Sequence, residues 1–378
     1  MNELTFTNGR IVLFDRVVHG SINIRDGVIA DISESPSRSG QDLEGDTVIP
    51  GCVELHTDHI ESHLQPRPKV RWNLQAALRA HDGQIATSGI TTVFDALRVG
   101  MEGDTEFGAQ DMCDIAQIIA ESAEQDSLRA EHFIHLRCEV SVDDVVEHFD
   151  ALSGNPRVRL ASLMDHAPGQ RQFVDPAAYR LYYQGKKKLS DADFERYCAR
   201  RTSESERNSD RNRKLIAQRC QAQGTAIASH DDALPAHVEE SIGLGVALAE
   251  FPTTIEAARL SHEAGLLVLM GAPNVVRGGS HSGNVSARTL LELGCLDILS
   301  SDYVHFSLIQ AAFFLADDGA TDLAHAVRLI LANPAEAARL DDRGRIETGR
   351  RADLVRVRTA SGQPPRVHSV WREGNRVA

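Results

Sequence analysis

Hydrophobic and polar positions follow different periods in different parts of the chain. Before residue 50, short runs of strand type alternate with turns, and Asn8-Gly9 is a dipeptide typical of tight hairpins. The tail from Asp341 repeats this style. Two short β-rich ends around a long middle part predict one small β-sandwich domain, which residues 1–50 and 340–378 form together.

The middle part alternates apolar runs of strand length with segments of helical period, such as 115–124 and 254–262. The expected strands lie at 48–55, 91–94, 132–139, 158–164, 226–229, 246–249, 266–270 and 296–299. Continuous apolar strands covered by helices are typical of a parallel sheet, and about eight are what a (β/α)₈ barrel requires. The pattern therefore predicts an α/β fold in which residues 51–339 form a TIM-like barrel.

A basic stretch near 175–214 is long for a connection between a strand and a helix. It carries Lys186 and its two lysine neighbours, followed by many arginines with interspersed acids. We expect a helical insertion over the barrel mouth. Two interpretations stay open: a solvated helix of mixed charge, and a lid that faces an anion.

Composition and charge narrow the class of protein. The chain has 378 residues, of which 42% are hydrophobic and 25% are charged, as in soluble globular proteins. Its formal net charge of −14 argues against a nucleic-acid-binding surface, which needs concentrated Lys and Arg. A small anionic substrate remains compatible, because a cleft can be locally positive on an acidic protein.

The sequence gives no sign of a membrane partner or of secretion. No apolar run is long enough to span a bilayer, and the first residues lack the basic and apolar regions of a secretion signal. The six cysteines are scattered without a CxxC pair, which favours reduced thiols. We therefore expect a cytoplasmic protein.

The candidate chemistry lies where the apolar runs end. His56 and Asp58 follow the first run and, because strand side chains alternate, they project from one face and can hold one ion. The acidic and imidazole residues that close later runs are Glu139, His166, His230 and Asp302. A barrel builds its active site from such strand ends. Imidazole and carboxylate ligands suit zinc, manganese or iron, so one or two divalent ions are expected.

Two of these positions have a competing interpretation nearby. Glu139 could be an exposed strand-end acid that pairs with Arg137, rather than a ligand. His166 competes with its neighbour Asp165, and it could also be a structural histidine. The sequence alone leaves both pairs open.

The later strand ends leave further alternatives. Asp231 or Asp232 could contribute beside His230, and Glu250, which also ends a strand, is a reserve ligand. For Asp302 the alternative is the N-cap of a helix, although the preceding serines could serve there instead.

Anionic groups of a substrate need donors as well as metals. The glycine-rich loop 277–284 follows a strand, and its amides and side chains can cradle phosphate or phosphonate oxygens. The expected substrate-binding residues are Arg171, Lys186, Arg277, Ser280, His281 and Asn284, with Arg67 and Lys69 as weaker candidates.

The chain resembles the amidohydrolase superfamily in its opening stretch 48–58 and in its closing stretches 333–335, 342–346 and 349–355. Within that superfamily it looks like the diphosphatases that act on α-D-ribose 1-methylphosphonate 5-triphosphate in the carbon–phosphorus lyase pathway. The stretches that carry this narrower resemblance are 66–70, 161–173, 182–186, 228–233, 249–254, 270–274, 277–284 and 299–303. They are spread over nearly the whole chain.

The resemblance implies a metal-dependent diphosphatase with a small anionic phosphorylated substrate. Water would attack the α-phosphorus of the ribose 5-triphosphate, giving pyrophosphate and the 5-phosphate in phosphonate catabolism. His56 and Asp58 would hold one metal, and Glu139 would bridge to a second metal held by His166 and His230. Asp302 would be both a metal-site residue and the catalytic group that orients the water and takes its proton.

The sequence leaves two alternative functions open. The first alternative is an amide or N-acyl hydrolase of the same superfamily, with a drier and less basic pocket. The second is an inactive member that serves as an assembly subunit; a homo-oligomer is one open outcome. The chain also departs from the resembled pattern at His59, where Asn is usual, and at Val304-His305-Phe306, where Tyr-Pro and a small residue are expected.

Overall fold

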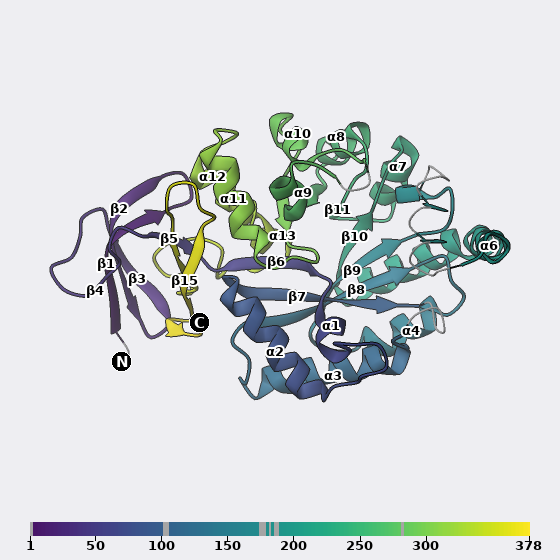
Figure 1. The fold of residues 1–378 in the computed structure, drawn as a ribbon, viewed down its shortest axis with the longest axis horizontal. Helices are drawn as coiled ribbons and strands as arrows, with labels where there is room; N and C mark the ends of the chain where they lie inside the picture. The colour runs from purple at the N-terminus through teal and green to yellow at the C-terminus, as the bar shows by residue number, and fades with distance from the viewer. Residues whose placement is uncertain (1–2, 101–105, 174–178, 181–182, 185–188, 281–282) are drawn as a thin grey trace.

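Two sheets make up the fold of this computed structural model, which describes residues 3–100, 106–173, 179–180, 183–184, 189–280 and 283–378. A parallel barrel occupies one side and a sheet built from both ends of the chain occupies the other, with both termini on that second side (Figure 1). No described helix combines the length and the apolar character that crossing a bilayer demands.

Eight parallel strands form the barrel in chain order, so that every strand lies beside its sequence neighbours. Their bounds are β6 (Cys52–Thr57), β7 (Ile90–Val99), β8 (Glu131–Glu139), β9 (Val158–Met164), β10 (Ala226–His230), β11 (Leu248–Glu250), β12 (Leu267–Gly271) and β13 (Ile298–Ser300). They are almost entirely buried, because helices cover them outside and side chains fill them inside. The expected (β/α)₈ fold is confirmed.

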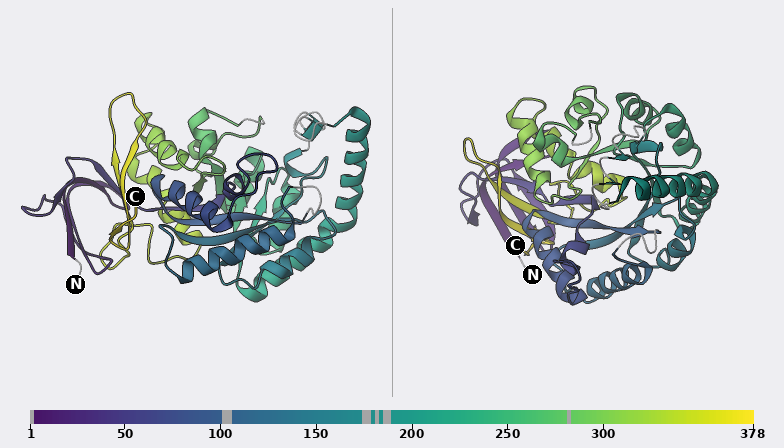
Figure 2. Two further views of the ribbon diagram at one scale, coloured as in Figure 1. Left: turned by 60° about the horizontal axis from the view of Figure 1, so that its bottom comes forward. Right: turned by 45° about the vertical axis from the view of Figure 1, so that its right-hand side comes forward.

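Helices follow the strands and surround the barrel (Figure 2). The described ones are α1 (Ile60–Leu64), α2 (Leu74–Thr87), α3 (Ala109–Glu124), α4 (Val145–Leu152), the 3₁₀ turn η1 (Arg171–Phe173), α6 (Asp191–Gln223), α7 (Pro235–Gly243), α8 (Ile255–Glu263), α9 (Ala272–Arg277), α10 (Ala287–Glu292), α11 (Ser307–Asp317), α12 (Leu323–Arg328) and α13 (Ala332–Ala337). Several begin at a side-chain cap, as α8 does at Thr254.

The terminal strands form one mostly antiparallel sheet. Its members are β1 (Glu3–Val12), β2 (Val17–Arg25), β3 (Val28–Ser33), β4 (Gln41–Asp42), β5 (Thr47–Pro50), β14 (Leu354–Arg358), β15 (Arg366–Arg372) and β16 (Asn375–Arg376). Ile29 of β3 and Trp371 of β15 belong to the same apolar core, so the sheet curls around that core. Gly51 alone separates β5 from β6. A domain boundary there and another near 340 stay predictions.

The basic stretch differs in its bounds from the expectation of 175–214. Helix α6 begins at Asp191 and continues to Gln223, where Gly224 ends it in a left-handed conformation. It contacts α4 and β10, so it is the crossover helix between β9 and β10, and it stands along one edge of the barrel (Figure 2, left). Lys186 and its neighbouring lysines lie outside the described residues.

A buried carboxylate closes the seam of the barrel between β13 and β6. Glu54 on β6 accepts a hydrogen bond from the Ser300 hydroxyl at 2.6 Å, and its second oxygen accepts one from the Ser301 backbone. The Asp58 amide then donates to the Asp302 carbonyl at 3.1 Å. Burial raises the pKa of Glu54. The seam therefore places the ends of the first and last strands next to each other.

A second buried polar network lies between α2 and the barrel wall. The Asp95 carboxylate bridges two imidazoles, with 2.7 Å to His81 Nε2 and 2.7 Å to His132 Nδ1, and His132 Nε2 reaches Asp82 at 3.2 Å. Burial alone would lower the pKa of His132, but Asp95 and Asp82 outweigh it and raise that pKa to about 9. His132 is therefore a cation held between two carboxylates at neutral pH.

This network predicts a pH-dependent stability. Because the pKa of His132 is raised from 6.5 to about 9 on folding, its contribution is complete below pH 6.5 and is lost as pH rises towards 9. The full contribution is roughly 3 kcal/mol. Denaturant unfolding between pH 6.5 and 9.5 should show this loss in the wild type and a flatter slope in Asp95→Asn. Parallel slopes for the two proteins would contradict the assignment.

Candidate metal and phosphate site

A cavity of about 880 Å³ opens where the barrel strands end. The candidate ligand residues all line it and come from the ends of five strands, β6, β8, β9, β10 and β13: His56, Asp58, Glu139, His166, His230 and Asp302. The structure thus brings the whole set together at the C-terminal face of the barrel, as the strand-end argument expects. Their roles as ligands stay predictions.

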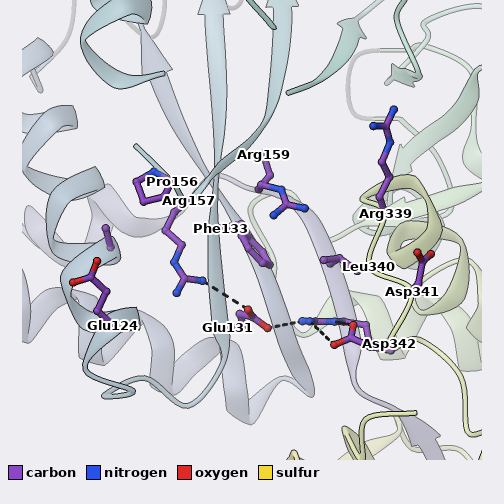
Figure 3. A pocket seen from close by; sticks show the side chains of 12 residues that line it. Glu124, Glu131, Phe133, Pro156, Arg157, Arg159, Arg339, Leu340, Asp341 and Asp342 are labelled. Atoms are coloured by element: carbon purple, nitrogen blue, oxygen red, sulfur yellow. Dashed lines mark hydrogen bonds and ion pairs between the residues drawn. The ribbon is translucent and has the colours of Figure 1, made fainter. Parts of the chain in front are cut away.

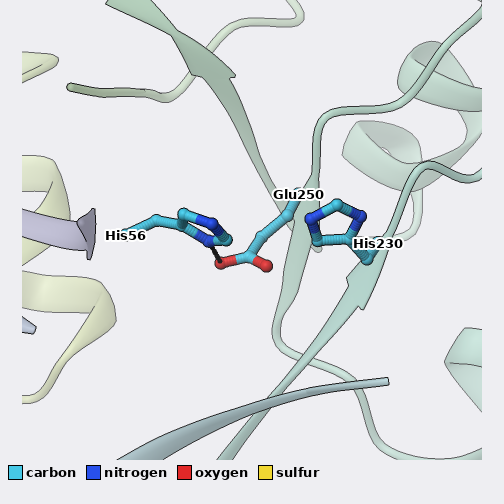
Figure 4. A group of neighbouring side chains, drawn as sticks. All are labelled: His56, His230 and Glu250. Atoms are coloured by element: carbon cyan, nitrogen blue, oxygen red, sulfur yellow. Dashed lines mark hydrogen bonds and ion pairs between the residues drawn. The ribbon is translucent and has the colours of Figure 1, made fainter. Parts of the chain in front are cut away.

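His56 and His230 face each other across the buried Glu250 carboxylate (Figure 4). His56 Nδ1 lies 3.4 Å from Glu250 Oε1, and the Ser162 hydroxyl donates to Glu250 Oε2 at 2.6 Å. Glu250 is 0% exposed. Metal-binding histidines commonly have a carboxylate on their second nitrogen, so Glu250 is placed either to orient His56 or to share its ion.

Glu139 and His166 form the opposite side of the set. His166 Nδ1 lies 2.7 Å from Glu139 Oε2, and its Nε2 lies 3.7 Å from Asp231. Burial opposes a charge on His166, but Glu139 and Asp231 raise its pKa to about 9. Glu139 therefore does not pair with Arg137, which contacts Asp58 instead at 2.6 Å.

Helix α6 holds this side in place with a polar stripe. Arg201, which is buried, donates to Glu139 Oε1 at 3.0 Å and to the Ser141 hydroxyl at 2.8 Å. The hydroxyls of Ser205 and Ser209 donate to Asp165. Asp165 thus points towards α6, and its neighbour His166 is the one that lines the cavity.

The donor set fits a divalent ion, because one buried imidazole nitrogen in it has no hydrogen-bond partner in the part of the chain that the structure describes. His230 is 6% exposed, its Nδ1 contacts Asp231 at 2.8 Å, and its Nε2 is buried without a hydrogen-bond partner among the described residues. His230 belongs to two groups whose ligand atoms lie within 4.8 Å of one another, with His56 and Glu250 and with His166 and Asp231. A cation would satisfy the orphaned nitrogen and balance the carboxylates.

Asp302 lines the cavity and is not the N-cap of the helix that follows it. The next helix, α11, has its N-cap at Phe306. Asp302 adopts φ 53°, a left-handed conformation that costs energy in a residue with a side chain, as do Asp231 and Phe251 after neighbouring strands. Burial raises the pKa of Asp302. The strained backbone aims the carboxylate into the cavity beside Asp58.

Two arginines of the cavity wall are not identified as candidate site residues from the sequence. Arg98 and Arg137 occupy paired positions on the adjacent strands β7 and β8, and both line the cavity. The apolar run that predicts β7 ends at Phe94, so the sequence does not point to Arg98. For Arg137 the sequence suggests only a pairing with Glu139. Together they bring positive charge to a wall otherwise rich in carboxylates.

The expected phosphate-binding residues divide into three groups. Arg277, Ser280 and Asn284 line the cavity, and Arg277 ends helix α9. Lys186 and His281 lie outside the described residues. Arg171 lies elsewhere: it is 3% exposed and its guanidinium is bonded to Asp232 and Glu240. The expectation that Arg171 contacts the substrate is therefore not supported, because its side chain does not line the cavity.

Arg277→Ala should weaken substrate binding more than turnover. Loss of one charged hydrogen bond to a phosphate oxygen should raise KM by roughly 10- to 100-fold and change kcat little. Steady-state kinetics would measure this, with Arg259→Ala as a control, since Arg259 pairs with Glu263 on α8. An unchanged KM would remove Arg277 from the binding residues.

A second cavity of about 630 Å³ opens at the opposite end of the barrel. It lies where β8 and β9 begin, and in its wall Glu131 contacts Arg157 at 3.7 Å and Arg343 at 2.7 Å (Figure 3). None of the candidate ligands lines it. At this face of a barrel such ion pairs contribute to stability rather than to chemistry.

Comparisons with known proteins add two findings on sequence. A model of the amidohydrolase family matches residues 225–378. The α-D-ribose 1-methylphosphonate 5-triphosphate diphosphatase of Escherichia coli (strain K12) is 46% identical over 380 residues, which covers 99% of this chain and 100% of that protein. The similarity therefore spans both the barrel and the terminal sheet.

Solved structures support the fold. A Xaa-Pro dipeptidase with bound methionine aligns over 99% of both chains with a TM-score of 0.68 and 16% identity. The N-acetylglucosamine-6-phosphate deacetylase of Thermotoga maritima aligns over 99% of both chains with a TM-score of 0.64 and 13% identity. Dihydropyrimidinase from Brevibacillus agri NCHU1002 aligns over 99% of this chain and 95% of that chain, with a TM-score of 0.66 and 13% identity. At these identities the likeness concerns architecture alone.

Proposed function

The chain belongs to the amidohydrolase family, and we propose on that premise that it hydrolyses α-D-ribose 1-methylphosphonate 5-triphosphate to the 5-phosphate and pyrophosphate. The relative that is similar over its whole length bears the name of this diphosphatase activity. The reaction is metal-dependent hydrolysis and belongs to phosphonate catabolism.

The arrangement of the cavity supports the proposed metal-binding roles. His56 and Asp58 would hold one divalent ion, and Glu139, His166 and His230 would hold a second, with Glu250 and Asp231 as supporting carboxylates. Zinc, manganese and iron all suit this nitrogen and oxygen donor set. Bound there, such an ion lowers the pKa of water and withdraws charge from phosphoryl oxygens.

The protein side chains then account for the proton and the leaving group. The water oxygen forms a bond to the α-phosphorus while the bridging bond to the β-phosphate breaks. The Asp302 carboxylate takes the water proton, and its burial, which raises its pKa, makes it a stronger base. Arg98, Arg137 and Arg277 line the same cavity and would balance the charge that develops on the departing pyrophosphate.

One feature of the cavity favours a phosphoanhydride substrate over an amide substrate. The cavity that holds the ligand set is also lined by three arginines, Arg98, Arg137 and Arg277, and by the polar side chains of Ser280 and Asn284. A polyphosphate needs such donors, whereas an amide or N-acyl substrate does not.

The test is an assay of the products. Protein with verified bound metal, incubated with the ribose triphosphate, should release pyrophosphate and no orthophosphate. ATP in place of the substrate would show whether the ribose 1-phosphonate is required. Release of orthophosphate alone, or cleavage of amide substrates without any pyrophosphate, would refute the proposal.

A further inference from the structure

Four histidines form a closed ring beside the main cavity. They are His59 before α1, His63 on α1, His81 on α2 and His305 after β13. The ring centroids of neighbours lie 4.7 Å apart for His59 and His305, 5.4 Å for His59 and His63, and 5.6 Å for both pairs that include His81. Only His59 also lines the main cavity.

Two of the four imidazoles are already oriented through one nitrogen. His81 Nε2 lies 2.7 Å from the ionised Asp95, so it carries the proton and leaves the Nδ1 lone pair available. That Nδ1 atom is buried and has no hydrogen-bond partner in the described part of the chain. His63 Nε2 likewise contacts the Gln84 side-chain oxygen at 3.0 Å. Histidines that bind metals are typically oriented in this way.

The third imidazole has no polar partner that would explain its burial. His305 is 1% exposed, and neither of its nitrogens has a hydrogen bond to any residue that the structure describes. Burial lowers its pKa to about 3, so the ring is neutral at physiological pH. Two unsatisfied nitrogens in one buried side chain cost stability unless a ligand engages them.

We propose that His59, His63, His81 and His305 form a further divalent-cation site outside the catalytic ligand set, which takes zinc or another ion that prefers imidazole ligands. Imidazoles that hold one zinc ion at about 2 Å have ring centres roughly 5 Å apart in a tetrahedral arrangement, close to the neighbour distances in this ring. Among the described residues no three of these imidazoles yet have ligand nitrogens within 4.8 Å of one another, and the rings meet edge to face. Binding therefore requires rotation at His59 and His63, the members that are only partly buried.

The donor set also determines which ions fit. Asp95 reaches the ring only through the far nitrogen of His81, so the four ligand atoms are neutral nitrogens. Magnesium and calcium, which need oxygen ligands, are excluded, while zinc, copper and nickel are favoured. The site is separate from the catalytic set and does not rest on the proposed reaction, although His59 would place the ion in the cavity wall next to Asp58.

Zinc stoichiometry tests this proposal. Untagged full-length protein is equilibrated in zinc-buffered solution, and bound zinc per chain is measured by elemental analysis. His305→Ala and His63→Ala should each bind one zinc ion fewer than the wild type, or bind it with at least about tenfold lower affinity in a chelator competition. Combination with His230→Ala should give additive losses, because the two sites are independent.

Three controls keep the outcome decisive. His325→Ala changes a histidine far along the chain and should retain the wild-type zinc content. Circular dichroism of metal-free protein checks folding, and if His305→Ala does not fold, the partly exposed His63→Ala decides alone. Wild-type zinc content and affinity in the ring variants would overturn the proposal, as would an equal loss in His325→Ala, which would indicate adventitious binding only.

Discussion

Asp302→Asn is expected to lower kcat by about 10³-fold while leaving the amount of bound metal unchanged. The amide keeps the size of the carboxylate but cannot accept the proton of the attacking water. Asp302 lies just after β13 in a left-handed conformation and lines the cavity beside Asp58, and its raised pKa makes it a candidate base. Elemental analysis together with steady-state kinetics separates loss of catalysis from loss of metal.

A matched control uses an acid at the other end of the barrel. Asp341→Asn changes an exposed residue at the second cavity and should have wild-type kinetics. Unimpaired turnover in Asp302→Asn with metal bound would remove Asp302 from the mechanism. Loss of the metal together with turnover would make it a ligand instead of a base.

His230→Ala is expected to abolish activity through loss of metal. The buried Nε2 of His230 has no partner among the described residues, and His230 belongs to both candidate metal groups of the cavity. Removing it should lower metal affinity by at least about 100-fold and turnover by a similar factor at limiting metal. Turnover measured against metal concentration should recover partly at high metal.

The control for this variant is His262→Ala. His262 lies on α8 and contacts Asp297 at 3.0 Å, away from the cavity. Its replacement should alter neither the metal content nor the metal concentration required for turnover. Wild-type metal affinity in His230→Ala would contradict the ligand assignment.

The barrel could be predicted because its signal repeats. Each strand is a short apolar run followed by a helical period, and every expected strand corresponds to an observed one. The ends of the strands were less predictable where a charged residue interrupts the apolar run. Strand β7, for example, extends past Phe94 to Val99 and carries Arg98 near its end. In sequence, an arginine that lines a cavity looks like the end of a strand.

The ligand candidates could be located because strand ends converge in a parallel barrel. The ion-pair partners of the surrounding arginines could not be predicted, because such pairing depends on the directions in which the side chains point. Arg171 follows β9 like a substrate contact, yet it is bonded to Asp232 and Glu240 beneath the surface. Arg201 lies in a charge-mixed helix, yet it supports Glu139. Only three-dimensional contacts distinguish these arginines from Arg277.

The histidine ring shows the same limit. His59 and His305 stand out in the sequence as two separate departures from the resembled pattern, nearly 250 positions apart by their numbering. The seam between β6 and β13 brings the ring centroids of His59 and His305 to 4.7 Å from each other. His63 and His81, on the helices next to them, carry no sequence signal of their own.

The central claim is that water attacks the α-phosphorus of a ribose 5-triphosphate in a cavity built from strand-end ligands. Hydrolysis in ¹⁸O-labelled water, followed by mass spectrometry of both products, tests it directly. We expect one labelled oxygen in the 5-phosphate and unlabelled pyrophosphate. Label in the pyrophosphate, or formation of orthophosphate in place of pyrophosphate, would contradict the account.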